Sequence, residues 1–249
     1  MKLHPELQFI ENARKPQKTT TARMDGKVCV ITGATSGVGL AAAHRLAQGG
    51  ADLILVCRNA EKAKSVQAEI QQNFRVKAHL VKADFSDLDQ VREAAGTILN
   101  NNPRIDVLIN NAGLHNTQRS LTSAGHELVF CVNHLASFLM TRLLLDRMIE
   151  SAPARIIQVN SQGHRFGGLN LEDLTWEKRR YRGLQGYGAS KVAQLLTVWE
   201  LADRVNGSGV TINAMHPGAV ASNIGMNNGR LYRWYQKFLL FPFLFLIHI

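Results

Sequence analysis

The chain has 249 residues, of which 45% are hydrophobic and 19% are charged, and its formal net charge is +10. This composition is typical of a soluble globular protein and provides enough apolar residues for one large domain or two small ones. The positive charge favours anionic ligands, but the chain carries no zinc-finger or helix-turn-helix pattern, so we do not expect a nucleic-acid partner. Its three widely spaced cysteines argue against a disulfide framework and against a metal site, and they favour a reducing, cytoplasmic setting.

The two ends of the chain differ in character from its middle. Residues 1–25 are polar and contain no apolar run, which predicts a flexible N-terminal arm and neither a signal peptide nor a membrane anchor. Residues 26–225 alternate between strand-like and helix-like patterns and form the predicted domain. Residues 226–249 include an apolar run that is too short to span a membrane. We expect this segment to pack on the domain as a lid or to mark a truncated chain, with contact to a membrane surface as the less favoured alternative.

A glycine-rich turn connects the first predicted strand and the first predicted helix. Residues 28–32 form a β-branched run typical of a buried strand, and residues 40–48 have helical character. Between them, Gly33, Gly37 and Gly39 follow a G-x-x-x-G-x-G spacing rather than the G-x-G-x-x-G of the general fingerprint. Glycines here allow a tight turn and a close approach of the backbone to a pyrophosphate, and the helix N-terminus adds N–H groups. The order strand, turn, helix therefore predicts the start of a dinucleotide-binding unit.

Arg58 and Asn59 end the second predicted strand, which covers residues 52–57. An acidic side chain at this place suits the adenosine ribose of NAD, whereas an arginine suits the 2′-phosphate of NADP. Asp52 stands at the start of the strand, which is the wrong end for that role. We therefore favour NADP binding by Arg58, and the alternative is that Arg58 is merely an exposed residue.

Polar and small residues follow the third and fourth predicted strands. Asp84 comes just past the third strand, where ligands bind in open α/β sheets. It either touches the adenine or caps the next helix, although Ser86 and Asp87 are better placed as caps. The fourth strand, at 105–109, ends in the Asn-Asn-Ala-Gly run of residues 110–113, whose small and amide residues let the backbone lie close to a flat ligand or tie neighbouring strands together.

The second half of the chain adds an unusual helix and a long loop. A helix-like pattern runs from residue 123 to residue 150 and contains Asn133, an unfavoured residue inside a helix, which indicates a contact in a polar cleft. Residues 155–159 form the fifth predicted strand, and Ser161 follows it closely. Residues 162–186 are irregular, polar and basic, and a loop of that length is often a functional lid or an insertion.

Tyr187 and Lys191 stand four residues apart at the head of an apolar, helix-like segment that ends near Arg204, so their side chains share one helix face. A fixed positive charge favours phenolate and lowers the pKa of a tyrosine, which lets it donate or accept a proton at working pH. Residues 210–215 form the sixth predicted strand. Strands and helices alternate throughout, which predicts one α/β domain built on a doubly wound parallel sheet.

Five motifs agree in order and position with one known family. They are Thr32-Gly33-x3-Gly37-x-Gly39, Asn110-Asn111-Ala112-Gly113, Ser161 after a strand, Tyr187-x3-Lys191, and Pro217-Gly218. Over residues 27–222 the chain resembles a short-chain dehydrogenase/reductase, which implies a Rossmann fold. The run from Cys57 to Asn59, the Ser161-x2-His164 spacing and the longer loop before Tyr187 are similar to the branch that holds retinol dehydrogenases and WW-domain oxidoreductases.

The resemblance implies hydride transfer between a nicotinamide and a small-molecule alcohol or carbonyl, with the cofactor carrying the chemistry. Tyr187 would be the general acid or base, and Lys191 would hold the nicotinamide ribose and lower the Tyr187 pKa. Ser161 would hydrogen-bond the substrate oxygen, and Asn133 would hold a water molecule in a proton relay. The implied cofactor-binding residues, with NADP preferred over NAD, are Thr32, Gly33, Ser36, Gly37, Val38, Gly39, Arg58, Asn59, Asp84, Phe85, Asn111, Ala112, Gly113, Tyr187, Lys191, Pro217 and Gly218.

Two features depart from the family pattern. We find no seventh strand after residue 222, so the apolar tail substitutes for it, the chain is truncated, or the sheet edge is exposed. Gln194 stands where this branch commonly has Asn, and we expect a mild effect. The alternative function is a catalytically inactive nucleotide-binding sensor or interaction protein on the same fold. Family members often pair through the helices that contain Asn133 and Tyr187, which suggests a homodimer or tetramer.

Overall fold

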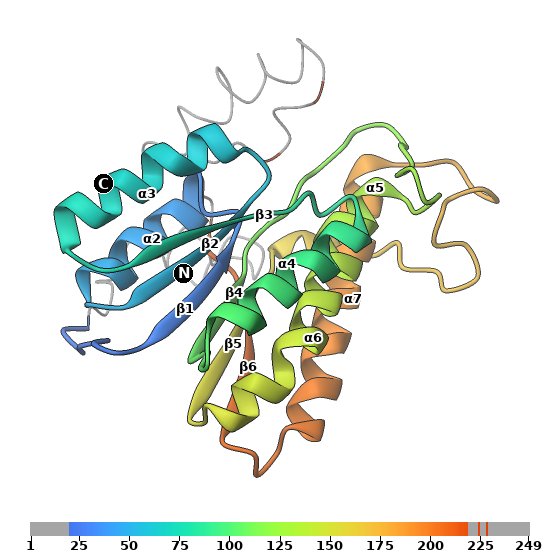
Figure 1. The fold of residues 1–249 in the computed structure, drawn as a ribbon. Helices are drawn as coiled ribbons and strands as arrows, with labels where there is room; N and C mark the ends of the chain where they lie inside the picture. Colours follow the sequence, from blue (N-terminus) through green and yellow to red (C-terminus); the bar gives the residue numbers. More distant parts are fainter. Residues whose placement is uncertain (1–19, 219–223, 225–227, 229–249) are drawn as a thin grey trace, which may run out of the picture.

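A computed structural model describes residues 20–218, 224 and 228 of the protein (Figure 1). Its centre is a six-stranded sheet in which every neighbouring pair of strands is parallel. The strands are β1 (Val28–Thr32), β2 (Asp52–Cys57), β3 (Ala78–Lys82), β4 (Val107–Asn110), β5 (Ala154–Val159) and β6 (Val210–Met215). Their spatial order is β3-β2-β1-β4-β5-β6, the order of doubly wound dinucleotide-binding sheets. The predicted fold class, one domain with a doubly wound parallel sheet, is confirmed.

Helices cover both faces of this sheet, with α2 and α3 on one face and α4, α6 and α7 on the other (Figure 1). The helices are α2 (Gly37–Gln48), α3 (Ala60–Phe74), α4 (Leu88–Asn101), α5 (Leu128–Phe130), α6 (Ala136–Glu150) and α7 (Gly183–Arg204), joined by the π-helical turn η2 (Cys131–Leu135) and the 3-10 helix η3 (Gln162–Phe166). Each face has its own apolar core. Ala43 and Ile70 pack on the first face with Ile31, and Met140 packs on the second with Leu108; all of these side chains are buried.

The central strands consist of nearly continuous apolar runs, as expected for strands that are covered on both faces. In β2, every residue from Leu53 to Cys57 is buried, and in β4 all four residues are. This explains why these strands were visible in the sequence as continuous apolar runs rather than as an alternating pattern.

The segment from α5 through α6, Leu128–Glu150, is long and apolar enough by length and composition to cross a membrane. In this fold, however, 61% of its most apolar window is buried inside the protein. Met140, Leu144 and Met148 are fully buried in the core that this segment shares with α4 and the sheet. Its hydropathy is therefore accounted for by core packing.

The predicted helix at 123–150 begins later than expected, at Leu128. Gly125 has a φ of +82°, in the left-handed region that ends or interrupts regular structure. The Glu127 carboxylate then accepts hydrogen bonds from the N–H groups of Val129 and Phe130, at 3.1 and 2.8 Å, and so caps the helix that follows.

Helix α7, in contrast, begins earlier than expected, four residues before Tyr187. Its first turns contain Gly183 and Gly186, which are poor helix formers. Both are needed for space. A Cβ at Gly183 would lie 2.5 Å from the Asn116 carbonyl oxygen, and a Cβ at Gly186 would lie 2.6 Å from the Tyr181 hydroxyl. Tertiary packing therefore overrides local propensity at this helix start.

The outer edge of β6 has no partner strand among the described residues. Thr211, Asn213 and Met215 alternate along β6, so they share one face of the strand, and all three are exposed. The six strands expected from the sequence are all present, and a seventh strand after residue 222 would lie outside the described residues. The predicted segment 226–249 lies outside the described residues, apart from Asn228.

Residues 1–19 of the predicted N-terminal arm also lie outside the described residues. The described part of the arm contacts helix α2. The Thr20 carbonyl accepts a hydrogen bond from Arg45 at 2.6 Å, and the Met24 N–H donates to the Gly49 carbonyl at 2.8 Å.

Candidate active site

The site begins where the sheet order reverses, between the carboxyl ends of β1 and β4, which is where doubly wound sheets bind ligands. The buried Thr32 hydroxyl accepts hydrogen bonds from the N–H groups of Asn111 and Ala112, at 3.0 and 2.9 Å. The Asn111 side-chain amide donates in return to the carbonyls of Thr32 and Gly33, at 2.9 and 3.1 Å. The sequence motifs after β1 and after β4 are thus tied into one rigid edge.

The glycine-rich turn fits closely against this edge. Gly33 and Gly37 have φ values of +69° and +56°, which favour glycine. A Cβ at Gly39 would overlap the Asn111 amide and the Gly33 carbonyl, so only glycine fits there. The turn is therefore shaped by backbone geometry, as its glycine spacing predicted.

Helix α2 receives no hydrogen bond from the side chain of its N-cap residue, which is Ser36. The half-buried Val38 lies in the first turn. Uncapped N–H groups at the positive end of a helix dipole bind phosphate, so the turn and helix together fit the pyrophosphate of a dinucleotide.

The residues after β2 divide between two roles. Arg58 is exposed at the carboxyl end of the strand. The Asn59 side chain accepts a hydrogen bond from the Lys62 N–H at 2.9 Å and caps α3. Asn59 therefore has a structural role as the N-cap of α3. A role in binding a cofactor remains a prediction for Arg58 and for Asn59.

Asp84 does not cap the helix after β3, and the alternative cap Asp87 does. The Asp87 carboxylate accepts from the N–H groups of Asp89 and Gln90, at 3.0 and 3.3 Å. Asp84 instead accepts from the Ser86 hydroxyl at 2.8 Å within its own turn. The Phe85 side chain is buried in the apolar core. Contact of Asp84 or Phe85 with an adenine remains a prediction.

Ser161 and Tyr187 are brought together around Gly163. A Cβ at Gly163 would lie 2.6 Å from the Tyr187 ring and 3.3 Å from the Ser161 hydroxyl. Ser161 caps η3 by accepting a hydrogen bond from the Gly163 N–H at 3.0 Å. The short 3-10 helix therefore holds the serine hydroxyl beside the tyrosine ring, although the sequence predicted only an irregular loop at these residues.

Lys191 lies on the same face of α7 as Tyr187, with its Nζ 5.5 Å from the centre of the Tyr187 ring. The side chain is only 4% exposed. Its Nζ donates hydrogen bonds to the Val159 carbonyl and to Gln194 Oε1, both at 3.0 Å. Burial lowers the pKa of Lys191 to about 7, because the charged form loses its contact with water.

Asn133 lies in the π-helical turn η2 and is fully buried. Its side chain clamps Leu114, accepting from the Leu114 N–H at 2.8 Å and donating to the Leu114 carbonyl at 3.0 Å. It also donates to the Ser190 hydroxyl at 3.0 Å. The polar contact that the sequence required of this amide is thus found, and it joins the segment after β4 to helix α7.

Two residues of this network, Asn160 and Gln194, were not among the site residues predicted from the sequence. Asn160 Nδ2 donates to the Lys191 carbonyl and to Gln194 Oε1, at 3.0 and 3.1 Å. Gln194 is 1% exposed and donates from Nε2 to the Asn133 carbonyl at 2.5 Å. A signal was present, since Gln194 follows Tyr187 by seven residues and Lys191 by three, which places it on the same helix face.

Pro217 and Gly218 follow the carboxyl end of β6, and Gly218 has a φ of +81°. Gly113 lies at the end of β4, where an added Cβ would be 3.2 Å from Asn133 Oδ1. All predicted site residues therefore gather along the carboxyl edge of the sheet or in the helices that start there. Their roles in catalysis and binding remain predictions.

The loop before Tyr187 is internally packed. Arg179 forms an ion pair with the buried Asp173 at 3.3 Å and lies over the Trp176 ring, 3.6 Å from its centre. The Tyr181 hydroxyl donates to the buried Glu127 carboxylate at 3.2 Å, and burial raises the pKa of both groups. These contacts anchor the loop to the start of α5 and to the first turns of α7, at the rim of the site.

A protein-family comparison assigns this arrangement to a known group. The model of the short chain dehydrogenase family matches residues 27–231. The chain is 40% identical over 225 residues to retinol dehydrogenase 13 of Homo sapiens, an alignment that covers 89% of this chain and 66% of that protein. The chain thus spans just under two thirds of the length of this relative. It belongs to the short chain dehydrogenase family of oxidoreductases and to its retinol dehydrogenase-like branch.

Solved structures share the same fold. An uncharacterized protein from Mycobacterium paratuberculosis is 34% identical, with a TM-score of 0.70 over 81% of this chain and 72% of that one. A proposed NAD(P) dependent gluconate 5-dehydrogenase from Beutenbergia cavernae, solved with NADP at low occupancy, is 28% identical, with a TM-score of 0.65 over 78% of this chain and 72% of that one.

The buried lysine makes stability depend on pH. A lysine in the unfolded chain keeps its proton to about pH 10.4, whereas the folded protein releases it near pH 7. Between these values the unfolded chain binds more protons, so the free energy of unfolding of the wild type should rise with pH, by up to about 1.4 kcal/mol per pH unit, relative to Lys191→Met. Urea unfolding of both proteins at about pH 7 and about pH 9.5 measures this difference. Parallel pH profiles would show that Lys191 titrates normally.

Proposed function

We propose that this protein is an NADP-preferring oxidoreductase that transfers a hydride between a nicotinamide and an alcohol or carbonyl substrate. The observation that carries the proposal is the convergence of Ser161, Tyr187 and Lys191 at the carboxyl edge of the sheet, beside a glycine turn that fits a pyrophosphate. Family membership supports the reaction class. The substrate is proposed as a small molecule, and retinoids belong in the first assay panel because a relative is named retinol dehydrogenase.

The nicotinamide would supply or accept the hydride when bound. The residues of this chain would orient the substrate and the cofactor and would transfer the proton. In reduction, the Tyr187 hydroxyl would donate a proton to the oxygen of the substrate carbonyl, and in oxidation the Tyr187 phenolate would take that proton back from the alcohol. The Ser161 hydroxyl beside it hydrogen-bonds the same oxygen and fixes its direction. Lys191 holds the nicotinamide ribose and, when charged, favours the phenolate form of Tyr187.

Replacing Tyr187 by phenylalanine tests the proton donor. Tyr187→Phe removes one oxygen and keeps the ring that packs on Gly163. Turnover of a carbonyl substrate should fall by about 10²- to 10⁴-fold, with the affinity for NADPH within about threefold of wild type. Tyr181→Phe is the matched control, because it removes a phenol that bonds Glu127 at the rim.

Retained turnover in Tyr187→Phe would remove Tyr187 from the mechanism. Tight NADPH binding by the wild type, with no turnover on a broad alcohol and carbonyl panel, would favour the alternative of an inactive nucleotide-binding sensor.

Arg58 is proposed to select NADP through the charge of its guanidinium. It is exposed at the end of β2, the position at which these folds distinguish the two cofactors. Arg58→Asp should weaken NADPH at least about tenfold, or about 1.4 kcal/mol, and change the Kd of NADH by less than about threefold. Nicotinamide fluorescence measures both affinities. Arg92→Asp on α4 makes the same change of charge at an exposed helix position. Equal losses for NADPH and NADH would make Arg58 an ordinary surface residue.

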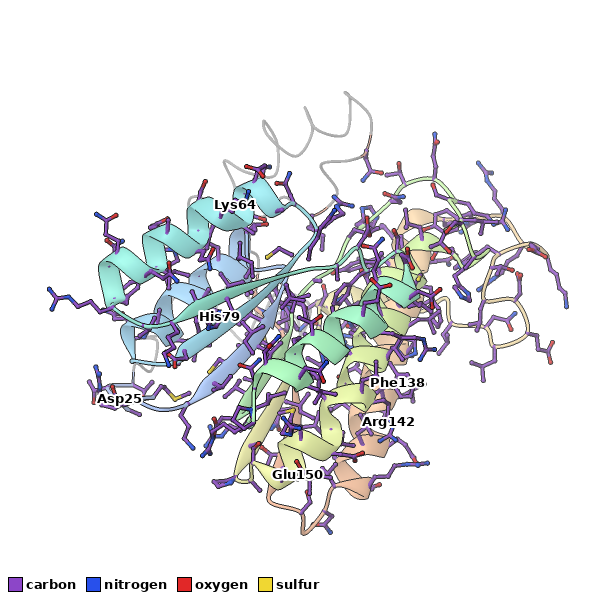
Figure 2. The ribbon with its side chains drawn as sticks, in the orientation of Figure 1. Asp25, Lys64, His79, Phe138, Arg142 and Glu150 are labelled. Carbon is purple, nitrogen blue, oxygen red and sulfur yellow. The ribbon has the colours of Figure 1, made fainter. Side chains whose placement is uncertain are left out.

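We further propose that two copies of the chain pair through the outer face of α6 and α7. Figure 2 shows Phe138 and Arg142 on the outer side of α6. Phe138 is 41% exposed, and Leu196 and Trp199 on α7 are 47% and 64% exposed. Phe138 and Leu196 line one hollow between the two helices, with Arg142 and Glu200 among the charged residues around it. Exposed apolar side chains beside opposite charges are typical of protein interfaces.

Sedimentation equilibrium tests the pairing. The wild type should sediment as a dimer or tetramer, and Trp199→Glu should lower the mass because it places a charge in an apolar contact. Leu171→Glu is the control, because Leu171 is 78% exposed and lies on the loop before α7. A monomeric wild type would contradict the proposal.

A further inference from the structure

Gln194 fills the space between Lys191 and Asn133. Its Oε1 accepts a hydrogen bond from Lys191 Nζ at 3.0 Å, and its Nε2 donates one to the Asn133 carbonyl at 2.5 Å. The side chain is 1% exposed, so both bonds are shielded from water. The resemblance to the family suggested a water molecule held by Asn133. In this structure, an amide bonds the Asn133 carbonyl.

The length of glutamine matters for this bridge. Asparagine is shorter by one methylene group, or about 1.5 Å, and would not reach both Lys191 and Asn133 from the same place on α7. The orientation of the amide is set by a third contact, because Asn160 Nδ2 donates to Gln194 Oε1 at 3.1 Å. The oxygen therefore faces the ammonium, and the NH₂ group faces the carbonyl.

We infer that Gln194 is a positioning residue, whose amide holds the Lys191 ammonium by a direct bridge to the Asn133 carbonyl. The inference rests on the proposed function only for the role of Lys191 in binding the nicotinamide ribose. An amide bridge fixes the position of the ammonium, but it does not pass protons along as a chain of water molecules does.

The surroundings of Lys191 make the effect of Gln194 measurable. Strand β5 contributes the Val159 carbonyl at 3.0 Å, and α7 contributes the Tyr187 ring at 5.5 Å. Tyr187 is the titratable group that faces Lys191 among the described residues, and burial is the cause of the lowered Lys191 pKa. The acceptors of hydrogen bonds from Nζ therefore decide how far its charged form is favoured.

The experiment is a pH titration of Lys191 in the full chain without cofactor. Lysine labelled with ¹³C at the ε position reports the protonation of each amine by NMR, and the Lys191 signal is the one absent from Lys191→Met. Gln194→Met keeps the length of the side chain but removes both bonds, and it should lower the Lys191 pKa by about half a unit or more. Gln194→Glu places a carboxylate at the same distance, and it should raise the pKa by about one unit or more.

The matched control is Gln67→Met on α3. Gln67 also bonds a backbone carbonyl, that of Ala78 at 2.6 Å, so the same chemical change is made far from the site. It should leave the Lys191 pKa unchanged. If Gln194 only fills space, Gln194→Met leaves the pKa unchanged as well, and the inference is overturned. Should Gln194→Met fail to fold by circular dichroism, Gln194→Glu decides, because an unchanged pKa beside a new carboxylate would show that the bridge is absent.

A second measurement links the bridge to the cofactor. The pH at which NADPH affinity changes should move with the Lys191 pKa, downward in Gln194→Met and upward in Gln194→Glu. Shifts in the NMR titration without any NADPH binding, in wild type or variant, would leave Gln194 as the positioning residue of Lys191 and would contradict the proposed function instead.

Discussion

A lysine ammonium that is almost wholly removed from water is the constraint on which the rest of the site depends. Burying such a charge is costly unless hydrogen bonds replace the lost water. Here those bonds come from β5, through Val159, and from α7 itself, through Gln194. Gln194 in turn is bonded to η2 and to Asn160 at the end of β5. The Lys191 amine therefore joins β5 and α7 directly and η2 through Gln194, and Tyr187 lies one helical turn before Lys191 on the same helix.

The two halves of the proposed site, one proposed for the nucleotide and one for catalysis, are built by different means. The nucleotide half is mainly backbone, in which glycines at Gly33 and Gly39 leave room for a close approach and Thr32 holds the turn to β4. The catalytic half is made of buried polar side chains whose hydrogen bonds satisfy one another. The halves meet at the segment after β4, where Asn133 clamps both backbone groups of Leu114.

The sequence predicted most of the fold, and the residues it proposed for the site lie near one edge of the sheet; the reasons are local. Apolar runs such as residues 52–57 predict buried parallel strands, and the spacing of the glycines after Thr32 predicts a tight turn. The arrangement of the buried polar network was not predictable, because it depends on contacts between residues far apart in the chain. Gln194 was expected to be a mild substitution, an expectation that stays untested, and its contacts with Lys191, Asn160 and Asn133 were not predicted. The start of α7 at Gly183 was not predictable for the same reason. Glycine usually indicates a loop, and only the close approach of Asn116 explains why a glycine stands in this helix.

The π-helical turn has a consequence for how this chain tolerates insertions and deletions. In η2 the Ala136 N–H bonds the Cys131 carbonyl, five residues back, so the turn holds one residue more than an α-helical turn. Loss of a single residue here would let the turn close to a regular α-helix and leave α6 in place, because the wide turn is what accommodates the extra residue. The apolar face of α6 would keep its packing, while Asn133 would leave the polar cleft. A one-residue gap at this turn in a related sequence therefore marks a protein with the same scaffold and a different site.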